Sequence, residues 1–562
     1  MTTLWHRWLW SALLVFQLVA LAPAQAAPEA KQQGRLVNAA WLQRHRADVV
    51  LLDASSTPQH RAGHIAGAVG ADLYRYGPDL PTPAAMQQRI RSWGVSPGRK
   101  TVLYDQGGDM MATRLFFDLH YHGVPAEDIF ILDGGLAAWR AAGGEITKDP
   151  TPAPSPGSHS VAQVREELRA RLPDFLVASG DRAGHVLVDA LEPGYYFGAQ
   201  RLYDRAGHVP GAVSMPSADF FNADKTFKSP QEIRSLARYW GIKPEQVVLS
   251  HCGGGVAASV PWFALQFLAG HAKTKIYLES QHEWLRDDRG LPFWTYGASQ
   301  LRRDAAWLAG WNAPMMRMFG VARLNIVDLR SEPQHAQGHV PFALNIPAQT
   351  FRSLLGNPEQ LAQRLGPAGV NPAHEIVIVS EGGLTPDAAL AFLALEQLGH
   401  AKVSVLMGSA EDWGLRGLEL TKQPTTVGAP SSPKDMAVPA ATYRAQPRAG
   451  LLISDPQAAR SDFPRVLVAS GKVPPTRMPR GGQQVGQQGG QQGGLLHLSH
   501  ADLIEADGTP KPAPELWKLM AKAGVPRHAE IVLVADDVAD AAVNYYLFRL
   551  MGWPDVKVWQ SL

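Results

Sequence analysis

The sequence contains one cysteine, Cys252, among 562 residues. A single cysteine can form neither an intramolecular disulfide, nor a CxxC redox pair, nor a cysteine zinc cluster. The chain also lacks an excess of one charge, because 53 Lys and Arg stand against 51 Asp and Glu. Nucleic-acid binding requires clustered cations, so we expect no nucleic-acid partner. We likewise expect no metal and no cofactor.

Long apolar runs are confined to the N-terminus, where residues 9–22 are apolar, Arg7 precedes them and Ala24-Gln25-Ala26 follows. This order is typical of a secretory signal peptide. An uncleaved anchor helix is the alternative, but the run is shorter than the about 20 residues that span a bilayer. We predict that residues 1–26 are a signal peptide, that the protein is periplasmic or secreted, and that no stable membrane span remains after cleavage.

Internal repeats divide the rest of the chain. Three copies each contain a strand-like run with a Gly-His turn, then an apolar strand with a Gly-rich turn, and then a third strand that we expect to end at a tryptophan. The turn histidine and the tryptophan lie 74 to 76 residues apart in every copy, in the pairs His64 and Trp139, His208 and Trp284, and His339 and Trp413. A fourth copy, recognisable from Ile531 onward, lacks the Gly-His turn and the final tryptophan. The sequence therefore predicts four units.

The predicted units comprise residues 34–148, 160–298, 305–425 and 440–562. Linkers rich in Pro, Ala and Ser separate the first unit from the second and the third from the fourth. A Gly/Gln tract from Gly481 is predicted to be a flexible insertion. Each unit alternates short Val/Ile/Leu strands with amphipathic helices, for example at 112–121 and 256–269. This pattern predicts an α/β fold in which each unit is an open parallel sheet with helices on both faces.

Cys252 follows an apolar strand of the second unit, at the carboxyl end where parallel sheets place their chemistry. We expect a helix to begin near Val256 and to point its N-terminus at the sulfur. The loop should also direct backbone N–H groups at the sulfur and lower the pKa of the thiol, which would make Cys252 a nucleophile. The alternative is a glycine-rich turn that merely carries a cysteine. The residues of this predicted loop are Gly253, Gly254, Gly255, Val256, Ala257 and Ala258.

The sister copies carry no thiol at this turn. Aligned on the turn, Cys252 corresponds to Gln106, Glu381 and Asp536 in the first, third and fourth units. None of these side chains can be a thiolate, so we predict one catalytic unit and three inactive ones. A protonated His251 could also lower the pKa of the cysteine. Neighbouring side chains at a strand end point to opposite faces, however, which disfavours this role.

The GHIAGAV and GHVPGAV turns, the strand followed by the cysteine loop and a helix, and the LDGGLAAW segment resemble the rhodanese sulfurtransferases. The order of an inactive and then an active unit resembles the two-domain thiosulfate and 3-mercaptopyruvate sulfurtransferases. The resemblance implies that Cys252 takes a sulfane sulfur from a small donor. The resulting persulfide, held by the amides of Gly253 to Ala258, then passes the sulfur to cyanide or a thiol.

The resemblance also implies substrate-binding residues. One family arginine is lost, because Leu191 stands in its position, and the other matches Arg201. We expect Arg201 to bind the donor's anionic group; the alternative for Arg201 is a solvated surface charge. Arg205 is the second candidate for binding this anionic group. In the mercaptopyruvate enzymes the turn histidine of the first domain faces the active cleft, and its position maps to His64. The resemblance therefore implies that His64 binds substrate, although a structural turn cap is the favoured alternative.

Two other functions compete with this one. The His-Cys turn also resembles that of cysteine phosphatases, but their required arginine falls at Ala258, so the charge clamp for a phosphoryl group is missing. The second alternative is a non-catalytic exported sulfur carrier or multidomain scaffold. Three inactive copies and the lost arginine favour it, whereas the intact cysteine loop argues against it.

Overall fold

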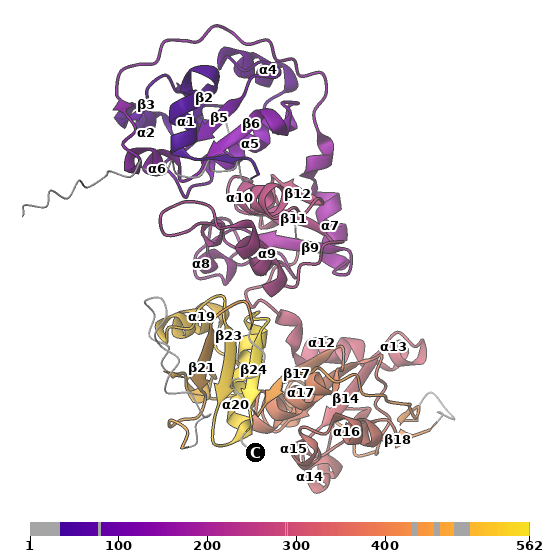
Figure 1. The fold of residues 1–562 in the computed structure, drawn as a ribbon. Coiled ribbons are helices and arrows are strands. Elements are labelled where there is room, and N and C mark those ends of the chain that lie inside the picture. The colour runs from indigo at the N-terminus through magenta and orange to yellow at the C-terminus, as the bar shows by residue number, and fades with distance from the viewer. Residues whose placement is uncertain are drawn as a thin grey trace, which may run out of the picture.

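Four five-stranded sheets make up the computed structural model, which describes residues 34–76, 80–286, 288, 290–428, 435–454, 461–476 and 495–560. The predicted signal peptide and Gly/Gln tract lie outside the described residues. Figure 1 shows the first two units stacked at the top, with the third and fourth side by side below them. Every strand pair within these four sheets is parallel, which confirms the predicted fold class.

All four sheets share one strand order. A short edge strand pairs with the last strand of its unit, which is followed in the sheet by two central strands and a second short edge strand. The first sheet is β1 (Leu36–Val37), β6 (Ile129–Leu132), β5 (Thr101–Tyr104), β2 (Val50–Asp53) and β4 (Val69–Gly70). The second is β8 (Arg169–Ala170), β12 (Thr274–Tyr277), β11 (Val247–His251), β9 (His185–Asp189) and β10 (Val213–Ser214).

The third and fourth sheets repeat this order. The third is β13 (Arg302–Arg303), β17 (Val403–Ser409), β16 (Glu375–Ser380), β14 (Leu324–Asp328) and β15 (Ala343–Asn345). The fourth is β20 (Leu452–Ile453), β24 (Val556–Trp559), β23 (Glu530–Val534), β21 (Arg465–Ala469) and β22 (Leu496–His497). Two small ribbons add β3 (His64–Ile65) with β7 (Ile146–Thr147), and β18 (Thr426–Val427) with β19 (Ala437–Val438).

Short helices connect the strands. The first unit has α1 (Ala39–His45), α2 (Thr57–Ala62), α3 (Leu73–Tyr76), α4 (Pro83–Ser92), α5 (Met111–Tyr121) and α6 (Gly135–Ala141). The second has α7 (Leu172–Gly180), α8 (Pro193–Tyr196), α9 (Pro230–Tyr239), α10 (Ser259–Phe263) and α11 (Ser280–Trp284). The third has α12 (Ala305–Trp311), α13 (Pro314–Met318), α14 (Glu332–Gln337), α15 (Ala348–Leu354), α16 (Pro358–Leu365), α17 (Pro386–Leu398) and α18 (Ala410–Leu415). The fourth has α19 (Ala513–Lys522) and α20 (Val538–Leu550).

The repeated tryptophans lie on helices and not at strand ends as predicted. Trp139, Trp284 and Trp413 are buried on α6, α11 and α18. In the first unit β6 ends at Leu132, and Gly134 adopts a left-handed conformation that turns the chain into α6. Each indole N–H donates to a backbone carbonyl six or eight residues further on. The equal spacing between the turn histidine and the tryptophan therefore marks the same helix in each unit. The indole N–H of that tryptophan closes the turn that follows the helix.

The first two units share one apolar core. Helix α5 packs on α10, where Phe116 contacts Phe263 with ring centroids 5.0 Å apart, and Phe117 meets Trp262 edge-on at 5.2 Å. The Thr113 and Ser259 hydroxyls are 2.8 Å apart across the same interface. Burial of these aromatic rings joins the two units.

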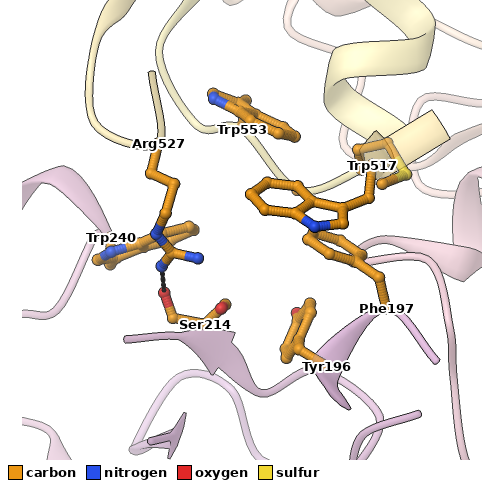
Figure 2. Close-up of a pocket in the computed structure, with 9 residues that line it drawn as sticks. Tyr196, Phe197, Ser214, Trp240, Trp517, Arg527 and Trp553 are labelled. Atoms are coloured by element: carbon orange, nitrogen blue, oxygen red, sulfur yellow. Dashed lines mark hydrogen bonds between the residues drawn. The ribbon is translucent and has the colours of Figure 1, made fainter. Parts of the chain in front are cut away.

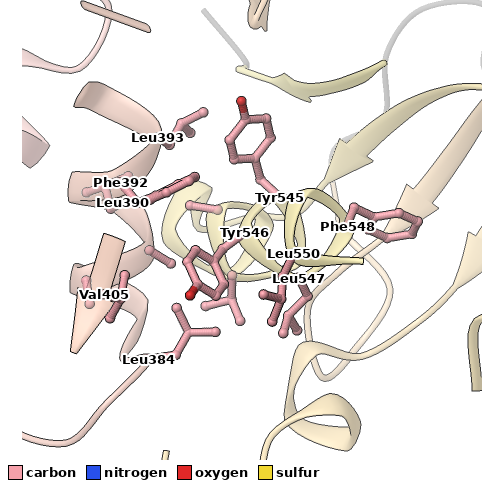
Figure 3. Packing of buried hydrophobic residues seen from close by; sticks show 14 of the residues in the cluster. Leu384, Leu390, Phe392, Leu393, Val405, Tyr545, Tyr546, Leu547, Phe548 and Leu550 are labelled. Atoms are coloured by element: carbon pink, nitrogen blue, oxygen red, sulfur yellow. The ribbon is translucent and has the colours of Figure 1, made fainter. Parts of the chain in front are cut away.

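The third and fourth units are joined in the same manner by α17 and α20 (Figure 3). Phe392 of α17 lies edge-on to Tyr546 of α20, with ring centroids 5.0 Å apart. The buried Glu396 carboxylate accepts a 2.5 Å hydrogen bond from Tyr545 and pairs with Arg549. Among the described residues, no helix combines the length and apolarity that a membrane crossing requires.

Candidate functional site

The strand register fixes which residues of the other sheets are equivalent to Cys252. In β9 and β11, Asp189 pairs with His251, and Cys252 is the next residue. Asp53 pairs with Tyr104 in the first sheet, Asp328 with Val379 in the third, and Ala469 with Val534 in the fourth. The equivalents of Cys252 are therefore Asp105, Ser380 and Ala535, each one residue before the position that the turn alignment predicted. The corrected positions also lack a thiol.

The Cys252 side chain is buried, with 2% of its surface exposed, inside a loop that curls around it. Helix α10 begins at Ser259 and not near Val256, so the chain from Gly253 to Ala258 remains free to wrap the sulfur. At Gly255 φ is +77°, and a Cβ there would lie 2.6 Å from the Leu278 carbonyl oxygen. Only glycine fits this tight passage between the loop and the strand that follows.

The pKa of Cys252 is raised and not lowered as the sequence predicted. Burial is the largest cause, and the carboxylate of Asp189 adds to it. Hydrogen bonds from the backbone N–H groups of Ala258, Gly254 and Gly255 oppose this rise. The loop thus does direct its amides at the sulfur, but the apolar surroundings outweigh them.

Neighbouring segments hold the loop at both ends. The Ser280 hydroxyl accepts from the Cys252 N–H at 3.1 Å, and the backbone N–H of Gln281 donates to the Cys252 carbonyl at 3.0 Å. The Gln281 side chain also donates to the buried Asp189 carboxylate at 2.9 Å. Burial raises the pKa of Asp189 to about 7, so this carboxylate titrates near neutral pH beside the cysteine loop.

Apolar and phenolic side chains contact the loop where it leaves the strand. The Tyr203 hydroxyl donates to the Gly253 carbonyl at 2.9 Å, and burial together with the nearby Cys252 raises the pKa of Tyr203. A Cβ at Gly253 would lie 3.1 Å from Leu202 and 4.0 Å from Leu191. Sequence reasoning noted Leu191 only as a lost arginine and missed Leu202 and Tyr203, although they lie next to Arg201 in the chain.

The two arginines considered for anion binding have different environments. Arg201 is exposed, and within the described part of the chain its guanidinium donates one long hydrogen bond, of 3.5 Å, to the Asp204 carbonyl. Arg205 is committed to the fold, because its guanidinium donates to the backbone carbonyls of Trp284, Leu285, Arg286 and Leu291. Arg205 is therefore a structural residue and not the second anion-binding candidate, because its N–H groups hold the segment that follows α11.

The turn histidines act as caps in all three units. His64, His208 and His339 each place Nδ1 on a backbone carbonyl of the preceding helix segment, at 2.7 to 2.9 Å. His64 is 1% exposed, and its Nε2 contacts the Thr151 hydroxyl, so its two ring nitrogens are used by the first unit and by the linker that follows it. This geometry favours the structural role of His64 over the catalytic one.

His251 does not assist the cysteine as a cation. Burial, and secondarily His208, lowers its pKa to about 3, so the ring is neutral at physiological pH. The ring lies edge-on to Phe175 with centroids 5.1 Å apart, within the apolar core on the other side of the sheet. The expected alternation of side chains at the strand end is thus observed.

In the first unit, Asp105 fills the loop that corresponds to the cysteine loop. Its buried carboxylate accepts the backbone N–H groups of Gly107 at 2.8 Å and of Ala112 at 2.9 Å. The second unit directs equivalent amides at a sulfur. An anion-binding arrangement therefore persists in the first unit and is occupied by a side chain of the unit itself.

Comparison with known proteins agrees with this geometry. A family profile described as "Rhodanese-like domain" matches residues 38–142, 172–287 and 313–415, which together exceed half of the chain. The chain belongs to the rhodanese family. The fourth sheet lies outside these matches, although it has the rhodanese strand order of the other three.

Three relatives each cover less than half of this rhodanese chain. A "Probable 3-mercaptopyruvate sulfurtransferase" of Pseudomonas aeruginosa is 32% identical over 249 residues, which are 41% of this chain and 84% of that protein. Sulfur carrier protein TtuD of Thermus thermophilus is 30% identical over 267 residues, covering 44% and 93%. The crystal structure of SseA from Escherichia coli is 25% identical, covers 44% of this chain and 98% of that one, and has a TM-score of 0.40. This rhodanese is a sulfurtransferase.

Proposed function

We propose that this sulfurtransferase moves a sulfane sulfur from a small donor to a thiol or cyanide through a persulfide on Cys252. One observation carries the proposal: the only thiol of the chain directly follows β11, inside a loop whose Gly254, Gly255 and Ala258 amides are directed at its sulfur. Such amides stabilise negative charge on either a thiolate or the outer sulfur of a persulfide.

The proposed first step is attack of the Cys252 thiolate on the outer sulfur of thiosulfate. The sulfur–sulfur bond of the donor breaks, sulfite leaves with the electron pair, and a Cys252 persulfide remains. With 3-mercaptopyruvate, the carbon–sulfur bond breaks instead, and the departing enolate takes a proton to give pyruvate. In the second step, cyanide attacks the outer sulfur, and thiocyanate and the Cys252 thiolate are formed.

The test is to incubate the purified chain with each donor and cyanide and to measure thiocyanate. We expect turnover with at least one donor and none in Cys252→Ser. Ser380→Ala is the matched control, because Ser380 occupies the equivalent position of the third sheet and should be dispensable. Turnover that survives in Cys252→Ser would refute the persulfide route.

A non-catalytic sulfur carrier is the second candidate. The deep burial of Cys252 and the presence of Leu191 where the family has a donor-binding arginine favour it. The relative from Thermus thermophilus, which bears the name sulfur carrier, supports it as well. A carrier would gain the mass of one sulfur atom on Cys252 without forming thiocyanate, so mass spectrometry of the same reactions separates the two functions.

We further propose that the protein is exported. The support is the sequence of residues 1–26, which has the three regions of a signal peptide in order. N-terminal sequencing of the chain from a periplasmic or culture fraction should begin at Ala27. An intact N-terminus in the cytoplasmic fraction would contradict export.

A further inference from the structure

The backbone carbonyl of Gly253, the residue after Cys252, accepts two hydrogen bonds. The Tyr203 hydroxyl donates to it at 2.9 Å, and the backbone N–H of His282 also donates to it at 2.9 Å. A carbonyl oxygen has two lone pairs, so both are used. Contacts from outside the loop therefore fix the direction of this carbonyl.

The direction of the Gly253 carbonyl decides where the next amide points. A trans peptide places its C=O and its N–H on opposite sides. Because Tyr203 and His282 hold the carbonyl, the Gly254 N–H of the same peptide points away from them, and this N–H is hydrogen-bonded to the Cys252 sulfur. A rotated peptide would present the carbonyl oxygen to the sulfur instead, and the oxygen would disfavour a thiolate.

Glycine on both sides makes this peptide easy to rotate. Neither Gly253 nor Gly254 has a Cβ that restricts its backbone. The φ angle of Gly254 is negative, and rotation of the peptide carries it to positive values, which glycine adopts freely. The loop thus depends on contacts from neighbouring segments to keep the Gly254 N–H directed at the sulfur.

The third unit has a donor at the same place. Gln334, which like Tyr203 lies five residues before its turn histidine, donates from its side chain to the Glu381 carboxylate at 2.8 Å. By strand register, Glu381 is the equivalent of Gly253. In the second unit this residue has no side chain, so the donor reaches the main chain and fixes the direction of a peptide.

The surrounding fold holds Tyr203 against the loop. Its half-buried ring lies edge-on to His282 with ring centroids 5.5 Å apart. Two residues further on, Arg205 binds the carbonyls that follow α11, the helix that contains His282. The segment that carries Tyr203 is therefore anchored to the same helix that supplies the other donor to Gly253.

We propose that Tyr203 is a positioning residue for Cys252: its hydroxyl holds the peptide between Gly253 and Gly254 so that the Gly254 N–H stays directed at the sulfur. The importance of this contact for sulfur transfer rests on the proposed function, in which the same amide stabilises the outer sulfur of the persulfide.

Alkylation of Cys252 by iodoacetamide on the full chain tests the placement without any sulfur donor. Tyr203→Phe removes only the hydroxyl, so the Gly254 N–H should leave the sulfur in a fraction of the molecules and the thiolate should lose stability. The rate at pH 8 should fall by about two- to tenfold, and the rate profile should shift to higher pH by about 0.3–1 unit. A merely structural role predicts the opposite, because a loosened loop would expose a thiol that is now 2% exposed and would speed alkylation.

Gly254→Ala supplies a rescue. A Cβ at this residue would lie 4.0 Å from the Tyr203 hydroxyl, which is ordinary contact, and alanine disfavours the positive φ that the rotated peptide needs. Gly254→Ala alone should therefore react as the wild type does. The double variant Tyr203→Phe with Gly254→Ala should recover most of the lost rate.

Tyr196→Phe is the matched control. The Tyr196 hydroxyl also donates to a backbone carbonyl, that of Ala212, at 2.7 Å. Figure 2 shows Tyr196 with Phe197 on the side of the second unit that meets the fourth. Loss of this hydroxyl should leave the alkylation profile unchanged.

Thiocyanate formation in the same variants separates this inference from the proposed function. Turnover in Tyr203→Phe should fall by the factor measured for alkylation. A wild-type chain that forms no thiocyanate, together with a shifted alkylation profile in Tyr203→Phe, would contradict the proposed enzyme and support the placement of Tyr203. An unshifted profile, faster alkylation in Tyr203→Phe, or no recovery in the double variant would overturn the inference.

Discussion

Asp105 and Cys252 occupy the same position in the first and second sheets, one residue after the strand residues that pair with Asp53 and Asp189. In one unit the loop amides bind a carboxylate, and in the other they face a sulfur. The first unit has therefore kept the anion-binding loop but closed it with its own side chain. This substitution gives a physical reason for the inactivity that the sequence predicts for the first unit.

The Asp105 carboxylate should make the stability of the first unit depend on pH. Burial, and secondarily Asp109, raises its pKa to about 6, above the value of an unfolded aspartate. Between these two values the folded state binds more protons, so the contribution of Asp105 to stability falls as pH rises. Asp105→Asn removes this titration. The stability of the variant relative to the wild type should therefore rise between about pH 4 and pH 6 and level off at higher pH.

Urea unfolding of both proteins at several pH values measures this difference. The exposed Ala141 serves as the control, because Ala141→Ser changes no titratable group and should give a difference that is flat with pH. A relative stability of Asp105→Asn that falls with rising pH would show that the carboxylate is stabilised, and not destabilised, by its surroundings.

Cys252 should react as a thiol with a raised pKa. Burial suppresses the thiolate at neutral pH, and the Asp189 charge suppresses it further. Alkylation by iodoacetamide should therefore keep accelerating above the ordinary cysteine pKa of about 8.5. Asp189→Asn should shift this profile to lower pH, because it removes the neighbouring negative charge. Mass spectrometry locates the adduct on the single cysteine, and a rate that reaches its plateau below neutral pH would contradict the assigned direction.

The sequence was sufficient for the repeats, the sheet class and the cysteine loop, because each depends on a local pattern. Alignment on the glycine-rich turn misplaced the equivalents of Cys252 by one residue. Three glycines follow Cys252 but two follow Gln106, so the first glycine of each run is not at the same position. Turn length varies between copies, whereas strand pairing preserves register. The direction of the Cys252 pKa shift was missed for a different reason: burial comes from residues distant in sequence, such as Ala190 and Met215.

Arg201 and Arg205 should separate into a binding residue and a structural one. Arg201→Ala should raise KM for an anionic donor and leave Tm unchanged, because its side chain is exposed and makes one long hydrogen bond. Arg205→Ala should lower Tm, because the carbonyls of Trp284 and Leu291 lose their donor, at a cost of about 1–3 kcal/mol for each buried group. Kinetics and calorimetry on the two variants check this. A KM that is unchanged in Arg201→Ala would remove Arg201 from the substrate site.

The interface between α17 and α20 should depend strongly on Glu396. This carboxylate is 6% exposed, and it accepts from Tyr545 while pairing with Arg549 of the fourth unit. Glu396→Ala removes the carboxylate partner of the Arg549 guanidinium, which keeps the Trp553 carbonyl as an acceptor. Breaking a buried ion pair in this way typically costs about 3–5 kcal/mol. The calorimetric transition of the third and fourth units should move down in temperature, while thiocyanate formation at 25 °C should persist, because the cysteine loop lies in the second unit.

Glu411→Ala is the matched control for Glu396→Ala. Glu411 is an exposed glutamate in the first turn of α18, where its charge gains only the favourable interaction with the helix N-terminus, about 0.3–1 kcal/mol. Equal shifts in the two variants would mean that the Glu396 network adds nothing beyond an exposed carboxylate. A large shift in Glu396→Ala alone would identify this network as the contact that holds the unmatched fourth unit to the third.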